Sequence, residues 1–278
     1  MASISLNLNL SPASYGNTAY SSGSDVSGYT SADIAALTNK QIAALTTSQV
    51  VALDPAALVG LTVTQVPALS DSSLSVLSTA QFTGLSNTQL GSFSAKQLKS
   101  LSTANIQALS TNQISAIKSS QISGLTTQQV QALTTDEVGA ISTSAIQAMS
   151  VDQIFALITA QIAAVGTAQL AALSALQVGA ISTTDIQVLG SDQLRTLGTA
   201  QVRGITSAQA TALTSDQVKS LTITQVGAFT SAQVKALDAG DIAVMGTDQI
   251  QAITTAGVTG LTAGQVTALT SAQFKNMT

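Results

Sequence analysis

Hydroxyl groups are the commonest potentially reactive groups in this chain of 278 residues, because Ser and Thr occur along its whole length. A hydroxyl becomes a nucleophile only beside a base that removes its proton, and the commonest such base at neutral pH is His. The chain contains no His and no Cys, so it offers neither that base nor a thiolate nucleophile. We therefore expect no catalytic residues and interpret the hydroxyls as helix caps.

Pairs of carboxylates are the second group that could do chemistry, since acidic side chains can ligate calcium. Asp136 with Glu137, and Asp238 with Asp241, are such pairs. The chain has no EF-hand loop, no Gly- and Asp-rich calcium nonapeptide and no Gly-rich phosphate-binding motif. Capping of helix starts explains the acidic residues better, so the sequence predicts no metal site and no cofactor.

Charge and hydropathy exclude further classes of protein. The 9 basic and 13 acidic side chains give a net charge of −4, which argues against a nucleic-acid partner. No stretch approaches the roughly 20 apolar residues of a membrane span. Residues 1–5 have neither the charged nor the apolar region of a Sec signal peptide, so we expect none. A hydrophobic content of 45% with only 8% charged residues disfavours disorder.

A strict eight-residue repeat organises almost the whole chain. Residues 30–277 divide into 31 consecutive octads without an insertion, and Thr214–Leu221 is a clean example. The consensus is Thr or Ser at position one, Gln at position four, apolar residues at positions five and eight, and a small residue at position seven. The small residue at position seven suggests that two backbones approach each other closely there.

Neither a continuous helix nor a single strand fits this spacing. Eight residues advance an α-helix by about 800°, so the apolar stripe would wind around it. In a strand, the apolar spacing of alternately three and five residues would switch faces of the pleat. One short helix per octad fits better, because Thr or Ser at position one and Gln three residues later form a capping box.

The charges support short helices. Every acidic residue within the octads lies at positions one to four, and six of the nine basic residues lie at position six. This order is the one that the helix dipole favours. Asp54 followed by Pro55 also fits a helix start. Pro67 at position six should distort its own helix, whereas Lys118 and Ile158 at position one cannot act as caps.

The predicted fold is therefore all-α: a solenoid of 31 very short capped helices, with positions five and eight inward and positions two, three and six outward. A helix of about six residues is unstable alone, so each must pack on neighbouring octads. Among the aromatic residues, Phe82, Phe93, Phe229 and Phe274 should lie in the core and Phe155 should be exposed. The alternative is a β-solenoid, in which stacked Gln side chains would form amide ladders.

Residues 1–29 form a separate segment before the repeat region of residues 30–278. Ile4, Leu6, Leu8 and Leu10 alternate with polar residues, which predicts a short β-strand ended by Pro12. The segment then becomes rich in Gly, Ser and Tyr. It could cover the first octad as a cap, join another copy by strand pairing, or be a disordered or targeting segment.

The sequence predicts a structural role. The last octad ends in Phe274 and Met277 with only Thr278 after it, so apolar surface at that end could stack on the start of another copy. Such head-to-tail contacts build fibres. We expect a homopolymer, a filament or surface layer, with the strand residues Ile4, Leu6, Leu8 and Leu10 helping to join copies. The alternatives are an adhesin stalk or a module that binds glycans, a cell surface or matrix polysaccharide, and an ice- or crystal-binding surface.

The octads also resemble known sequences. The sequence of Leu125–Leu133, LTTQQVQAL, is similar to the low-complexity Thr/Ser/Gln/Ala/Leu arrays of large bacterial secreted and cell-surface proteins. This resemblance covers residues 30–277 and carries no catalytic or binding residues. It implies an extracellular or cell-surface protein that is exported without a Sec signal peptide.

Overall fold

A computed structural model describes residues 25–277, and the structural statements below refer to these residues. Thirty α-helices and one 3-10 helix follow one another in this part of the chain, and no strand occurs in it. The predicted all-helical fold is thus confirmed for residues 25–277, and the alternative β-solenoid is not supported. The predicted strand at Ile4–Leu10 lies outside the described residues. The chain forms two compact units, which meet in sequence between Leu133 and Thr134.

The first unit contains thirteen described helices. They are α1 (Ser31–Ala36), α2 (Asn39–Ala43), α3 (Thr47–Ala52), α4 (Pro55–Leu58), η2 (Val66–Ala68), α5 (Asp71–Ser75), α6 (Thr79–Thr83), α7 (Asn87–Leu90), α8 (Ala95–Lys99), α9 (Thr103–Gln107), α10 (Thr111–Ser115), α11 (Ser119–Ile122) and α12 (Thr127–Ala132). One helix falls in each octad.

The second unit continues with one helix per octad. Its described helices are α13 (Thr135–Ala140), α14 (Thr143–Ala148), α15 (Val151–Phe155), α16 (Thr159–Ala164), α17 (Thr167–Ala172), α18 (Ala175–Ala180), α19 (Thr183–Ile186), α20 (Ser191–Arg195), α21 (Thr199–Gly204), α22 (Ser207–Ala212), α23 (Ser215–Ser220), α24 (Ile223–Ala228), α25 (Ser231–Ala236), α26 (Ala239–Val244), α27 (Thr247–Ala252), α28 (Thr255–Val258), α29 (Ala263–Ala268) and α30 (Ser271–Lys275).

The predicted capping box starts most of these helices. At α22, the backbone N–H of Gln209 donates to Thr206 Oγ1 at 3.1 Å, and the backbone N–H of Thr206 donates to Gln209 Oε1 at 2.7 Å. Two N–H groups that a helix start leaves without a partner are thereby satisfied. Leu213 at position eight then takes extended backbone angles and ends the helix.

The irregular octads behave as their sequences predict. Pro67 lies in η2, a 3-10 helix of three residues, where the other octads have α-helices. Lys118 and Ile158 stand at helix starts without a side-chain cap, and only the Gln three residues later bonds to their backbone N–H.

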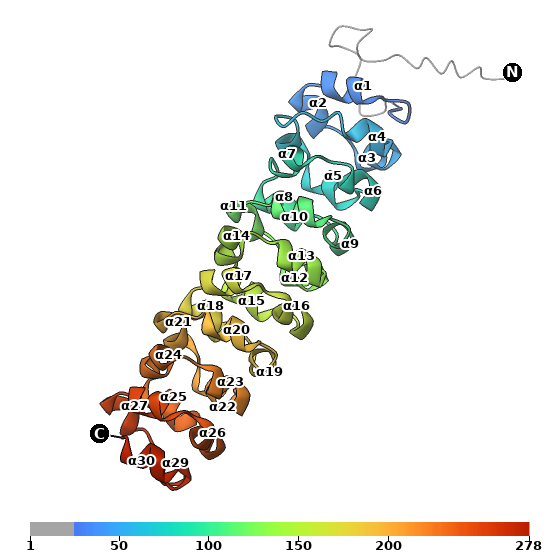
Figure 1. The fold of residues 1–278 in the computed structure, drawn as a ribbon. Helices are drawn as coiled ribbons and strands as arrows, with labels where there is room; N and C mark the ends of the chain where they lie inside the picture. Colours follow the sequence, from blue (N-terminus) through green and yellow to red (C-terminus); the bar gives the residue numbers. More distant parts are fainter. Residues whose placement is uncertain (1–24, 278) are drawn as a thin grey trace, which may run out of the picture. The chain divides into compact units, whose positions relative to one another are not determined.

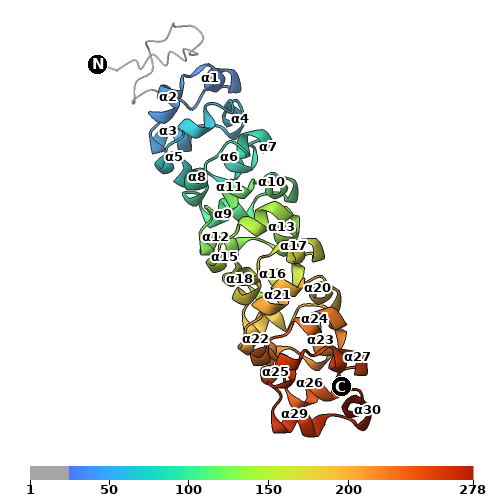
Figure 2. The same cartoon turned by 90° about the vertical axis from the view of Figure 1, so that its left-hand side faces the viewer.

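Within each unit, helices pack on the helix three octads further along. In the second unit these pairs include α18 with α21, α21 with α24, and α26 with α29. Figure 1 shows α18, α21 and α24 following one another along one side, and Figure 2 shows α26 beside α29 from a second direction. In the first unit, α1 packs on α4 and α9 on α12. The chain therefore coils within each unit, as the octad pattern predicts.

The core consists of the residues at positions five and eight. In the octad of α23, Val218 and Leu221 are buried, whereas Ser215, Asp216 and Lys219 at positions two, three and six are exposed. The same pattern recurs along both units, so the predicted inward and outward positions are confirmed there. Even Ala210, the one small residue at position five, is buried.

Candidate functional site: glutamine clamps between successive turns

The most elaborate polar arrangement in the described residues is built by the Gln at position four. Gln209 is 1% exposed, and its Oε1 accepts the capping hydrogen bond from Thr206 described above. Its Nε2 donates to two backbone carbonyls of an earlier octad, Val178 at 2.8 Å and Ile181 at 2.6 Å. These carbonyls lie at the end of α18, where a helix leaves C=O groups without a partner. One side-chain amide therefore joins the start of one helix to the end of another.

We call this arrangement the glutamine clamp, and it recurs through both units. In each case Nε2 donates to the carbonyl 28 residues earlier, and usually to a second one 30 or 31 residues earlier. The clamp residues are Gln65, Gln81, Gln89, Gln97, Gln113, Gln121, Gln129, Gln169, Gln177, Gln193, Gln201, Gln209, Gln217, Gln225, Gln233, Gln249, Gln265 and Gln273.

The clamp indicates how many octads make one turn of the coil. The offset of 28 residues joins position four of one octad to position eight of the octad four before it, whereas helices that pack side by side are three octads apart. One turn of the coil therefore takes between three and four octads. Sequence reasoning identified the capping half of this Gln but missed the half that crosses between turns. The only signal for it was the frequency of Gln at position four, since a Glu could also complete the capping box.

Shorter polar residues at position four form partial clamps. Asn105 donates through Nδ2 to the Leu77 carbonyl at 3.0 Å, and its Oδ1 has no hydrogen-bond partner. Asp185 and Asp241 cannot donate, and each instead accepts a hydroxyl hydrogen bond from a neighbouring turn. Thr159 donates to Asp185 at 2.6 Å and Ser215 donates to Asp241 at 2.8 Å. Most octads thus carry a polar side chain at position four, and the exceptions are Ala57, Ala145 and Gly257.

The predicted assembly residues fall into two groups. Phe274 is 63% exposed and Met277 is half-buried, at the last described turn. The prediction that Phe274 belongs to the core is wrong, because no later octad in the described chain lies against it. Phe82, Phe93 and Phe229 are buried as predicted, and Phe155 is 65% exposed as predicted. Ile4, Leu6, Leu8 and Leu10 lie outside the described residues.

The carboxylates named in the sequence occupy helix starts. Asp136 is exposed, Glu137 and Asp241 are buried in position-four slots, and the backbone N–H of Asp238 donates to Asp241. Among residues 25–277, no cluster of three or more His, Cys, Asp or Glu side chains could hold a metal ion. In the same part of the chain, no helix has the length and hydropathy needed to cross a membrane.

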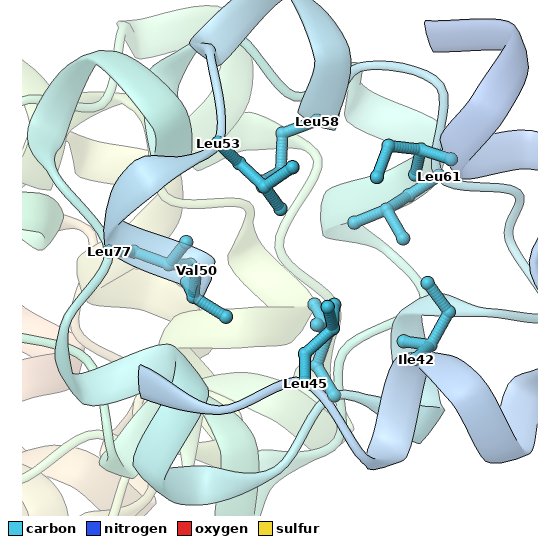
Figure 3. Close-up of a pocket in the computed structure, with 9 residues that line it drawn as sticks. Ile42, Leu45, Val50, Leu53, Leu58, Leu61 and Leu77 are labelled. Atoms are coloured by element: carbon cyan, nitrogen blue, oxygen red, sulfur yellow. The ribbon is translucent and has the colours of Figure 1, made fainter. Parts of the chain in front are cut away.

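A small apolar cavity lies inside the first unit, as Figure 3 shows. Its volume is about 10 Å³, and its lining is wholly aliphatic: Ile34, Ile42, Leu45, Val50, Leu53, Leu58, Leu61, Leu69 and Leu77. A buried water needs at least this space and two to four polar partners. The cavity offers no polar partner, so we interpret it as a packing defect and not as a binding site.

Comparison with known proteins identifies the repeat. The ALTTAQ repeat family matches residues 30–63, 130–167, 186–223 and 242–278, which together make up just over half of the chain. No curated protein matches the chain. The matches lie in both units, and each contains several position-four slots.

Proposed function

Since this chain belongs to the ALTTAQ repeat family, we propose that it is a structural protein and not an enzyme. In this proposal the octads form a solenoid, and copies of the solenoid join head to tail into an extracellular filament or surface layer. The partner is a second copy of the same chain. We further propose a bacterial origin and export without a Sec signal peptide, which rest on the compositional resemblance of the octads alone.

The observation that supports the proposal best is the periodicity of the glutamine clamp. Gln273 donates to Ile242 and Met245 just as Gln209 donates to Val178 and Ile181. In each turn, nearly the same pair of backbone carbonyls accepts hydrogen bonds from the Gln amide of the following turn. Surfaces that match internally at every step would also match between copies, which makes a heterologous contact that does not close.

Exposed apolar side chains at the last described turn are the second support. Val258, Val266 and Phe274 occupy position five, which is buried in the earlier octads, yet all three are exposed. Contact of these side chains with another copy would remove their apolar surface from water, at about 25 cal/mol per Å².

The test compares two Phe→Asp variants of the whole chain. Phe274 and Phe155 are exposed to similar extents, so both variants should fold. The proposal expects the unaltered protein to form polymers in sedimentation velocity and negative-stain images. Phe274→Asp should reduce them to single chains, whereas Phe155→Asp should leave them unchanged. Monodisperse single chains of the unaltered protein at all concentrations would refute self-assembly.

An adhesin stalk or surface-binding module is the second candidate. Val151, Phe155 and Leu176 are exposed apolar residues, and they lie on α15 and α18, two helices that pack on each other. Such a patch is a candidate binding face for a cell surface or a matrix polysaccharide. This candidate predicts saturable binding to a glycan array without self-assembly, and Phe155→Asp should weaken that binding while Phe274→Asp should not.

A further inference from the structure

Glu137 differs from every other residue in the position-four slots. It is the only Glu among the 278 residues, and it stands where 22 octads carry Gln. Its side chain is 2% exposed at the start of α13. The backbone N–H of Thr134 donates to Glu137 Oε2, and the backbone N–H of Glu137 donates to Thr134 Oγ1 at 3.2 Å. The capping half of the clamp is therefore intact.

The other half of the clamp is missing. Glu137 Oε1 is buried and has no hydrogen-bond partner. In a glutamine clamp the corresponding atom is Nε2, which donates to backbone carbonyls. An ionised carboxylate has only acceptors, but a protonated carboxyl group has one O–H donor. Protonation is thus the one change that would let Glu137 donate as Gln does.

The surroundings of Glu137 contain little charge. Between Lys99 and Asp152, the only charged residues are Lys118, Asp136 and Glu137. The helix α16, which packs on α13, carries no ionisable side chain. Asp136, the neighbouring residue on α13, is exposed and negative. Within the described residues, no ion pair involves Glu137.

Burial and charge act on the carboxyl in the same direction. Burial is the main cause that raises the pKa of Glu137 above its ordinary value, and the charge of Asp136 raises it further. The hydrogen bonds from Thr134 oppose this by lowering the pKa, but the net shift is upward. The folded protein therefore binds a proton at Glu137 more tightly than the unfolded chain does.

We propose that Glu137 is a proton-operated clamp. In acid, its carboxyl group is neutral, so the buried side chain carries no charge and gains an O–H donor. Above its raised pKa the group is ionised and buried, and its Oε1 has no hydrogen-bond partner, so the start of α13 is less stable. The array thus contains one turn whose stability depends on pH. This inference does not rest on the proposed assembly.

The direction of the effect follows from linkage. The folded-state pKa is raised, so the penalty for the buried charge is absent below the ordinary Glu pKa and fully present above the raised value. Glu137→Gln removes the titrating group and restores a permanent donor. We expect this variant to melt about 2–4 °C higher than the unaltered protein at pH 8. At pH 4 the two melting temperatures should converge.

A converse variant and a control complete the test. Gln209→Glu places the same group in a slot with a fully formed clamp, so it should lower the melting temperature at pH 8 and regain stability at pH 4. Gln251→Glu adds the same charge at an exposed position six and should have little effect at either pH. A difference between Glu137→Gln and the unaltered protein that is the same at both pH values would overturn the proposal.

The titration can be read directly even if a variant fails to fold. Because Glu137 is the only Glu, labelling with 13C-glutamate gives one carboxyl resonance in the whole protein. The proposal expects that resonance to titrate above the ordinary Glu pKa in the folded chain and at the ordinary value in denaturant. An equal or lower pKa in the folded chain would rule out a proton-operated clamp.

Discussion

The carbonyl oxygen of Ala175 lies directly against Gly204, where a Cβ atom on the glycine would be only 2.3 Å from it. Gly204 occupies position seven at the end of α21, and Ala175 begins α18, the helix on which α21 packs. The same close approach occurs between Gly124 and Ala95 in the first unit. The small residue that the sequence places at position seven thus allows one backbone to pass close to another.

We expect Gly204→Ala to destabilise the second unit. The added Cβ would force α18 and α21 apart, and such overpacking usually costs about 1–3 kcal/mol. Gly240→Ala is the matched control, because Gly240 also lies in a helix but has no atom within 4 Å of the added Cβ. It should stabilise by about 0.4–1 kcal/mol through the unfolded state. Urea unfolding measures both; equal effects would contradict the close-approach interpretation.

Replacing a clamp residue should cost more than replacing its exposed neighbour. Gln129 donates to the carbonyls of Leu98 and Leu101, each at 2.8 Å, whereas the adjacent Gln128 is exposed. Gln129→Met keeps the volume but removes the donor, and each buried group left without a partner costs about 1–3 kcal/mol. Gln128→Met should change stability by less than about 0.5 kcal/mol. Thermal melts of the two variants should therefore differ clearly, and similar melting temperatures would argue against the clamp.

The cavity of Figure 3 should accept one additional methyl group. Val50 lines the cavity, so Val50→Ile should stabilise the first unit by about 0.5–1.5 kcal/mol, the reverse of a typical Ile→Val loss. Val130 occupies the same position of a later octad, is fully buried and does not line the cavity. Val130→Ile should therefore be neutral or destabilising. If guanidinium unfolding shows a higher free energy of unfolding for both variants, filling the cavity is not the cause of the stabilisation.

Four helix starts offer room for a better cap. Gly166, Gly190, Gly198 and Gly246 provide no side-chain cap, and the nearest atom to an added Cβ is the Gln Oε1 of the same octad, at 3.4–3.7 Å. A Ser at these positions could accept from the N–H of that Gln. Relative to Gly, a Ser cap adds only a few tenths of a kcal/mol at each site. The quadruple Gly→Ser variant should therefore unfold at a measurably higher denaturant concentration, and an unchanged midpoint would contradict the expected caps.

Local structure could be predicted from the octad because its causes lie within eight residues. Thr206 and Gln209 satisfy each other's backbone groups without help from other turns, and Pro67 shortens its own helix. The buried and exposed positions follow from the apolar spacing for the same reason. Phe274 shows the limit of this reasoning, because its burial depends on a following turn and not on its own octad.

The contact between turns could not be predicted from the repeat. One turn takes between three and four octads, so like positions do not stack on like positions, and Gln81 at position four meets Leu53 at position eight. Because a turn is not a whole number of octads, the sequence shows no longer period that would reveal the contact. The unpaired Oε1 of Glu137 could not be predicted either, because Glu completes a capping box as well as Gln does.

The fixed reach of the clamp also has a consequence for how the chain folds. No hydrogen bond named above joins residues more than 31 positions apart, in a chain of 278. Contacts of such short sequence separation favour fast folding, and an array with only nearest-neighbour contacts can nucleate at any point. Five successive octads already contain a complete clamp. A nascent chain could therefore begin to coil once about that much of it has left the ribosome, and each later octad would add to a structure already formed.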